Sequence, residues 1–223
     1  MYILYGGKFT RSALVEQVMA ECDVRCELRH INTAKREQKS PDFLKINPAG
    51  WVPALITPEG NTLYETPAIN LFLAERHAIP DLAPALDDPD RGLFLSGLFY
   101  ISGMLEPALK RYWFSDRYGD GAEDADAVRS KAWQDALEYF TVIDTRLAEN
   151  GPFHLGERFS LVDLMLAYWS ESFVEPASID HLSAIQHCHE LVYQRPKLRP
   201  HKYAQRDSIA ELYQLRATGG GVR

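Results

Sequence analysis

Hydroxyl side chains stand at two expected helix starts in the first third of the chain. Thr10 and Ser12 precede apolar residues at helical spacing, and Thr66 precedes Pro67, which suits the first turn of a helix. The free N–H groups and the dipole of a helix N-terminus favour a negative charge. These hydroxyls could therefore stabilise a bound anion. Ordinary helix capping is the plainer alternative for all three.

An acid stands directly before the second helix start. Glu65 offers a carboxylate that could pair with an ammonium group, and the adjacent Thr66 offers a hydroxyl and an N–H that could hold a carboxylate. Together they suit a ligand that carries both charges. The alternative is a surface acid in front of a capped helix.

Dithiol and disulfide chemistry is disfavoured by the cysteine pattern. Cys22, Cys26 and Cys188 form an odd set that matches neither a disulfide framework nor a zinc spacing, which favours small core residues in a reducing cytoplasm. No cysteine lies between Gly6 and Val15, which excludes a dithiol redox motif at the first helix. A glutaredoxin-like disulfide mechanism is therefore disfavoured.

Metal ions and nucleic acids are not expected partners. His187 and His189 flank a cysteine, but adjacent helix positions face different directions. The net charge is −7, with 9 basic and 9 acidic residues up to His77 and 15 basic and 22 acidic residues after it. No basic run could release counterions from a phosphate backbone.

Membrane insertion and export are also not expected. The opening Met-Tyr-Ile-Leu-Tyr is typical of a strand, without the basic lead and long apolar region of a signal peptide. The most apolar stretch, Leu93 to Leu105, is broken by serines and glycines and is shorter than the ~20 residues that a membrane span needs. The pattern favours a cytoplasmic protein with a buried helix there.

The first part of the chain alternates strands and helices. A strand at Tyr2–Tyr5, a helix and a second strand at Arg25–Ile31 predict a parallel pair with a right-handed crossover. Val52–Ile56 and Thr62–Glu65 flank the turn residues Pro-Glu-Gly-Asn and predict an antiparallel hairpin. A helix capped by Thr66 follows. We expect this α/β domain to span residues 1–77.

The second part is helical in period. Residues 78–90 hold three prolines and four aspartates, which predicts an extended, solvated linker. Residues 91–223 form the predicted all-α domain. Its clearest helix start is the capping box between Ser160 and Asp163. The glycine run at 219–221 predicts a disordered tail.

Three segments resemble the cytosolic glutathione transferase superfamily in its bacterial-type form. They are Asn47-Pro-Ala-Gly-Trp-Val-Pro-Ala-Leu55, Glu65-Thr-Pro-Ala-Ile69 and Gly156-Glu-Arg-Phe-Ser-Leu-Val-Asp163. The resemblance covers nearly the whole chain. It implies a thioredoxin-like N-terminal domain that binds glutathione and an all-helical C-terminal bundle domain. It also implies glutathione as co-substrate, no metal, a small electrophile as second substrate and a homodimer.

The resemblance assigns glutathione-binding roles to the first two segments. Val52 would bind the cysteinyl backbone of glutathione through its main chain, before a cis Pro53. Glu65 would pair with the γ-glutamyl ammonium and Thr66 with its carboxylate. Trp51 departs from the Lys or Gln common in the family. It could line one side of the pocket. Lys35 or Lys39 could then supply the positive charge that holds the glycyl carboxylate of glutathione, or remain a solvated loop residue.

The family stabilises the glutathione thiolate with a residue near the end of the first strand. Thr10 is favoured, because it falls where many bacterial members have serine, and Ser12 and Tyr5 are the other hydroxyl candidates. Capping by Thr10 or Ser12, with Tyr5 as a core residue, is the alternative. A different placement of a loop gap would set Phe9 opposite the family serine.

The second substrate is expected near Phe9 and the first long helix of the second domain. The candidates there are Tyr100, Met104, Arg111, Tyr112 and Trp113. An aromatic, Met-containing lining suits an apolar electrophile, although such residues at helical spacing are more often core. Besides conjugation, two hypotheses stay open: a non-catalytic binding or regulatory protein, and a glutathione-dependent isomerase or peroxidase.

Overall fold

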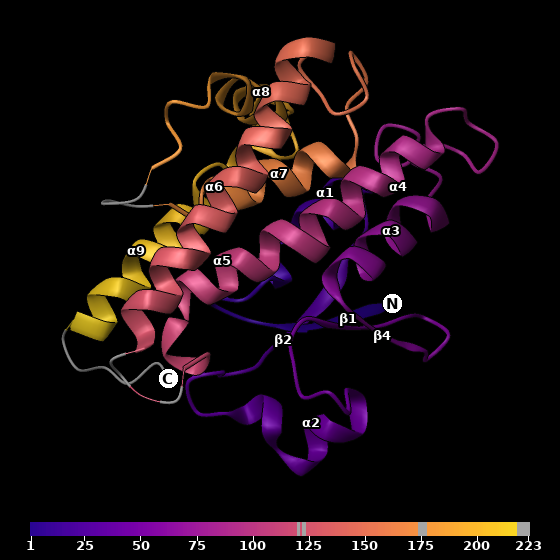
Figure 1. Ribbon diagram of the computed structural model, residues 1–223. Helices are drawn as coiled ribbons and strands as arrows, with labels where there is room; N and C mark the ends of the chain where they lie inside the picture. Colours follow the sequence, from indigo (N-terminus) through magenta and orange to yellow (C-terminus); the bar gives the residue numbers. More distant parts are fainter. Residues whose placement is uncertain (120, 122–123, 174–177, 218–223) are drawn as a thin grey trace. The chain divides into compact units, whose positions relative to one another are not determined.

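The chain divides into two compact units. The computed structural model describes residues 1–119, 121, 124–173 and 178–217, and the glycine tail at 219–221 lies outside them (Figure 1). The first unit contains residues 1–79 and the chain from 195 onward, and the second contains residues 80–194.

A four-stranded mixed sheet forms the centre of the first unit. Its strand order is β2-β1-β3-β4, with β1 and β2 parallel and the other neighbours antiparallel. The parallel pair and the hairpin predicted from the sequence are thus confirmed, with strand bounds within two residues of those expected. The strands are β1 (Tyr2–Gly6), β2 (Cys26–His30), β3 (Ala54–Ile56) and β4 (Thr62–Tyr64).

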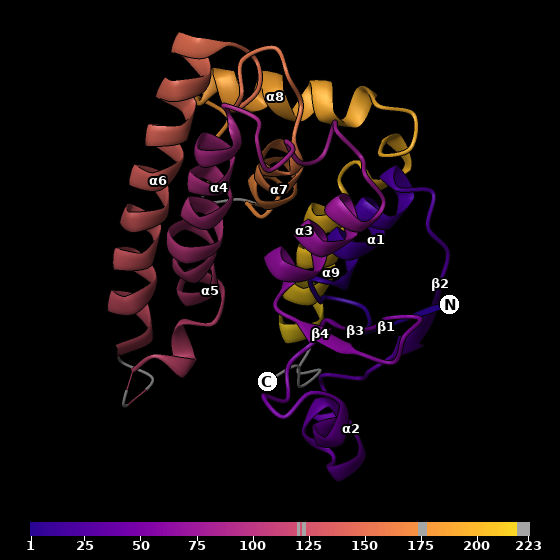
Figure 2. The ribbon, with the colours of Figure 1, turned by 90° about the vertical axis from the view of Figure 1, so that its right-hand side faces the viewer.

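Helices cover both faces of this sheet. The α1 and α3 helices lie on one face and pack against each other, while the short α2 helix lies on the other (Figure 2). Buried Leu4 and buried Tyr5 point to opposite faces, because successive strand residues alternate. The helices of this unit are α1 (Ser12–Glu21), η1 (Glu37–Lys39), α2 (Pro41–Ile46), α3 (Thr66–Arg76), η4 (Arg199–His201) and α9 (Ala204–Ala217).

The end of the chain groups with the first unit, whereas we expected it within the helical domain. Arg195 donates to the buried Glu21 at 2.7 Å, and Lys197 donates to Asp23 at 2.6 Å. Lys8 and Glu211 form a further ion pair. These pairs join residues more than 170 positions apart, so hydrophobic periodicity carries no sign of them.

Helices joined by loops form the second unit, with two isolated β-bridges at residues 153–158 in its described part. α6 packs against α5 and α8, and α7 packs against α4 and α8 (Figure 1). Its helices are α4 (Arg91–Tyr100), η2 (Ile101–Leu105), α5 (Glu106–Trp113), η3 (Ser115–Arg117), α6 (Asp124–Asn150), α7 (Leu161–Ser170) and α8 (Ser183–Gln194).

The apolar stretch expected to be a buried helix is longer than its sequence indicated. α4, the π-helical turn η2 and α5 form one continuous helix of 23 residues, which by length and composition alone could cross a membrane. Phe94, Leu98, Ile101 and Leu105 are nevertheless buried within this unit. These four side chains therefore form protein core, whereas Phe99 of the same helix is 59% exposed.

The segment predicted as a solvated linker is partly buried. Leu82 is fully buried, and its carbonyl accepts a hydrogen bond from the N–H of Leu161 at 2.8 Å. Asp88 forms an ion pair with Arg158 at 2.9 Å. Leu82 and Asp88 thus anchor this proline- and aspartate-rich segment to residues at and just before the start of α7.

Candidate functional site

Three loops meet at one end of the sheet. Tyr5 of β1 stands opposite Ala54 of β3, and Ala54 stands opposite Tyr64 of β4. The same end of the sheet therefore carries three segments: the loop after β1, the Val52-Pro53 segment before β3, and Glu65 after β4. The predicted binding residues, which are far apart in sequence, are brought together by this register.

The Val52-Pro53 peptide bond is cis, as the resemblance implied. The main-chain N–H and carbonyl of Val52 form no hydrogen bond with the described residues. The segment before it is held by the buried Asn47, whose side-chain amide donates to the Trp51 carbonyl at 2.8 Å. A fixed loop thus presents the unpaired main chain of Val52.

Glu65 and Thr66 have an unusual conformation at the start of α3. Glu65 has φ +68°, a region that non-glycine residues rarely adopt and that is often found at binding sites. Its exposed side chain does not cap the helix. Thr66 is the first helical residue rather than the expected cap, and it is only 1% exposed.

The hydroxyl of Thr66 has no hydrogen-bond partner among the described residues. Leaving a buried hydroxyl unpaired is unfavourable by about 1–3 kcal/mol, so such groups usually have a partner. One turn later, the fully buried Asn70 also has both amide atoms unpaired within the described chain. Sequence analysis missed Asn70, although an amide between the apolar Ile69 and Leu73 was a visible signal.

The loop after β1 is closed by hydroxyl hydrogen bonds. The Thr10 hydroxyl donates to the Gly7 carbonyl at 2.7 Å and accepts from the Gly7 N–H at 3.1 Å. Ser12 is buried and lies 3.0 Å from the Thr10 hydroxyl. Phe9 has φ +62°, which turns the chain between Gly7 and Thr10. Thr10, which is half-buried, is thus the more accessible of the two hydroxyls.

Tyr5 is held on the α2 side of the sheet. Its ring packs edge-on against Phe43, with the ring centres 5.9 Å apart, and its hydroxyl accepts a hydrogen bond from Arg29 at 2.8 Å.

Trp51 is 53% exposed, and the Lys39 ammonium lies 4.4 Å from the centre of its ring. The structure thus places Lys39, one of the two lysines considered for the missing charge, beside Trp51.

The candidates for the second substrate have different environments in the helical unit. Tyr112 is buried in an aromatic cluster with Trp113 and Phe173, so it is a core residue there. Arg111 pairs with Asp135 at 3.2 Å. Met104 is 43% exposed, and Tyr100 lines a pocket within this unit.

The three cysteine thiols are not activated as nucleophiles. Burial raises the pKa of Cys22 to about 11 and also raises the pKa values of Cys26 and Cys188, so their thiols stay protonated at neutral pH. Within the described residues, no group of three or more histidine, cysteine or acidic side chains could hold a metal ion.

Comparison with known proteins decides the family. Residues 1–75 match the model of the glutathione S-transferase N-terminal domain family, so the match includes the cis-proline loop and the Glu65-Thr66 pair. This chain therefore has a first domain of the glutathione S-transferase N-terminal family. Its sheet order and helical second unit agree with the two-part fold expected from the sequence.

Proteins similar in sequence to this chain carry different activities in their names. Glutathione S-transferase D7 of Drosophila melanogaster is 28% identical over 194 residues, which cover 85% of this chain and 81% of the relative. The disulfide-bond oxidoreductase YfcG of Escherichia coli is 28% identical over 204 residues, covering 88% and 92%.

A solved superfamily structure shares the fold. The glutathione transferase homolog from Sulfitobacter, crystallised with bound glutathione, superposes with a TM-score of 0.78 at 23% identity. The superposition covers 91% of this chain and 97% of the homolog.

Proposed function

We propose that this chain binds glutathione and joins it, through its sulfur, to an electrophilic carbon of a small, apolar molecule. The observation that carries the proposal is the buried hydroxyl of Thr66, which has no partner in the described part of the chain. It lies beside the exposed carboxylate of Glu65, at the sheet end that presents Val52. This end offers an acceptor for an ammonium, donors for a carboxylate and a free main-chain edge. The γ-glutamyl-cysteinyl part of glutathione carries the complementary groups.

The proposed reaction begins with the glutathione thiol, which loses its proton to solvent. A hydroxyl at the start of α1 stabilises the resulting thiolate, helped by the N–H groups of that helix. The sulfur then attacks the electrophilic carbon, forming a carbon–sulfur bond as the leaving group departs with its electron pair. Thr10 is the proposed donor, and its proton must turn from the Gly7 carbonyl toward the sulfur.

Replacing Thr10 tests this role. Thr10→Val is expected to lower kcat by roughly tenfold, a modest effect for one lost donor, with little change in glutathione affinity. It should also raise the pH at which the bound thiol ionises, measured by the ultraviolet absorbance of the thiolate. Thr10→Ser, which keeps the hydroxyl, is the matched control. An unchanged thiol titration in Thr10→Val would remove Thr10 from the mechanism.

Replacing Glu65 tests the ammonium contact. Glu65→Gln is expected to weaken glutathione binding by roughly 3- to 10-fold, because it removes one charged partner of a half-exposed pair. Isothermal titration calorimetry with glutathione and with an analogue lacking the γ-glutamyl ammonium measures the contact. The variant and the native protein should bind the analogue equally. Glu75→Gln, at the other end of α3, should bind like the native protein; a matching loss there would disprove a specific contact at Glu65.

A second candidate function is glutathione-dependent disulfide exchange. It is favoured by the similarity to a named disulfide-bond oxidoreductase that is covered over 92% of its length. Assays with 1-chloro-2,4-dinitrobenzene and with 2-hydroxyethyl disulfide, both with glutathione, separate the two reactions. Turnover of the aromatic halide supports conjugation, and turnover of the disulfide alone supports exchange. Retention on a glutathione column without either turnover would favour a binding protein. A homodimer remains a prediction by analogy with the superfamily.

A further inference from the structure

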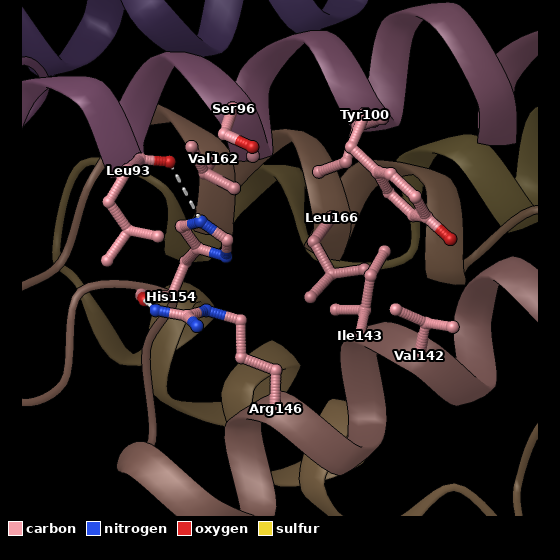
Figure 3. A pocket seen from close by; sticks show the side chains of 11 residues that line it. Leu93, Ser96, Tyr100, Val142, Ile143, Arg146, His154, Val162 and Leu166 are labelled. Carbon is pink, nitrogen blue, oxygen red and sulfur yellow. Dashed lines mark hydrogen bonds between the residues drawn. The ribbon is translucent and has the colours of Figure 1, made fainter.

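A small pocket lies within the helical unit, between α4, α6 and the start of α7. Its volume is about 170 Å³, close to the roughly 150 Å³ of an engineered protein cavity that accepts benzene. Apolar side chains form most of its wall, among them Ile143, Val162 and Leu166, with the ring of Tyr100 along one side (Figure 3). All lining residues belong to the second unit, so the pocket is separate from the proposed glutathione site.

Two polar side chains, His154 and Arg146, occupy one end of this pocket (Figure 3). The Arg146 guanidinium donates to the His154 carbonyl at 3.2 Å, which fixes the two side by side. The Nε of Arg146 is buried without a partner, and this arginine forms no ion pair with the described residues. A half-buried cation thus lacks a neutralising carboxylate at the pocket wall.

The hydrogen bonds of His154 determine what its free nitrogen offers. Its Nε2 lies 3.2 Å from the Leu93 carbonyl, which only accepts, so Nε2 carries the hydrogen. Burial lowers the pKa of His154, so the ring is neutral at neutral pH and Nδ1 carries only a lone pair. Nδ1 is buried without a partner within the described chain, and the side chain is 8% exposed.

The helix beside the histidine is shaped to seat this ring. A Cβ atom at Gly97 would lie 2.4 Å from Nε2 of His154, so any larger residue there would displace the imidazole. The main-chain N–H of His154 is also held, because it donates to the buried Asp163 at 2.6 Å. The acceptor nitrogen is therefore rigidly placed.

The pocket end thus offers one acceptor, the Nδ1 lone pair, beside the N–H donors of Arg146. A hydroxyl satisfies both, because it donates its hydrogen to Nδ1 and accepts from the guanidinium. A carboxylate satisfies only the arginine and sets its lone pairs against that of Nδ1. A hydrocarbon satisfies neither.

We propose that this pocket is a second ligand site, which takes a small aromatic molecule carrying a hydroxyl group, a phenol. The hydroxyl bonds to His154 and Arg146, and the ring lies against Ile143, Leu166 and Tyr100. The site operates independently of glutathione. It is occupied whether or not the proposed transferase reaction occurs.

Three matched probes test the chemistry: 4-methylphenol, 4-methylbenzoate and toluene. Each is titrated into the whole protein, with and without saturating glutathione, and binding is followed by calorimetry and by the ¹⁵N resonance of the His154 Nδ1. The phenol is expected to bind at least about tenfold more tightly than either other probe, because only its hydroxyl satisfies both His154 Nδ1 and Arg146. The Nδ1 resonance should move with the phenol alone, and glutathione should change nothing.

Variants locate the site without touching the buried histidine. Arg146→Met is expected to weaken phenol binding by about tenfold. Val142→Trp, at a 53% exposed position on the pocket rim, should abolish it by filling the space. Lys131→Met makes the same charge change elsewhere on α6 and should bind normally. The proposal is overturned if toluene or the benzoate binds as well as the phenol, or if Val142→Trp leaves binding intact.

Discussion

Thr66→Val is expected to weaken glutathione binding by roughly 10- to 100-fold, the effect of losing a hydrogen bond to a charged group. The change is isosteric and removes a hydroxyl that is buried and unpaired within the described chain. The unfolding temperature should therefore stay the same or rise. Calorimetry measures the affinity for glutathione, and thermal unfolding measures the stability. A loss of affinity without a loss of stability would identify the hydroxyl as a ligand contact.

Thr66→Ser is the matched control for this prediction. It keeps the hydroxyl at the start of α3 and should bind glutathione within a few-fold of the native protein. If Thr66→Val also binds normally, the unpaired hydroxyl serves no ligand. If both variants lose binding and unfold earlier, Thr66 is a packing residue.

Asp163→Asn is expected to lower the free energy of unfolding by roughly 2–6 kcal/mol, because two buried N–H groups lose their acceptor. The carboxylate accepts from the main-chain N–H groups of His154 and Ser160 at 2.6 and 2.8 Å and from the Ser160 hydroxyl at 2.8 Å. Burial raises the pKa of Asp163 to about 6, so it is mainly ionised at pH 7.5. An amide would turn an N–H₂ group toward these donors.

Urea unfolding at pH 7.5 measures the effect, and Ser160→Ala provides the comparison. That variant loses the helix cap but keeps Asp163 as acceptor, so it should be destabilised by only about 1 kcal/mol. Equal losses in the two variants would mean that the capping box, rather than the acceptor for His154, accounts for the stability. Because Asp163 also fixes the His154 loop, Asp163→Asn should weaken phenol binding in the second pocket.

The fold was predictable where local chemistry determines it. The Pro58-Glu59-Gly60-Asn61 turn predicts the hairpin, and Gly60 indeed has φ +89°. Hydrophobic spacing predicts α1, α6 and α7. The capping box at Ser160 is present as expected. The grouping of the chain end with the first unit was not predictable, because it depends on pairs such as Arg195 with Glu21 that no local pattern encodes.

The candidate site was predictable as a set of residues but not as a set of hydrogen bonds. The signature segments indicate Val52, Glu65 and Thr66, and the strand register brings them to one edge. Sequence alone could not show that the Thr10 hydroxyl bonds to Gly7, since that depends on the turn at Phe9. The second pocket was equally hidden, because Leu93 and Tyr100 of α4 reach Arg146 and His154 only through tertiary packing.

A crystal structure of the protein grown with millimolar glutathione tests the central claim most directly. We predict one glutathione at the sheet end, with a γ-glutamyl carboxylate oxygen within about 3.2 Å of the Thr66 hydroxyl and the cysteinyl main chain paired with Val52. Glutathione bound elsewhere, with the Thr66 hydroxyl and the Val52 main chain still unpaired, would contradict the account.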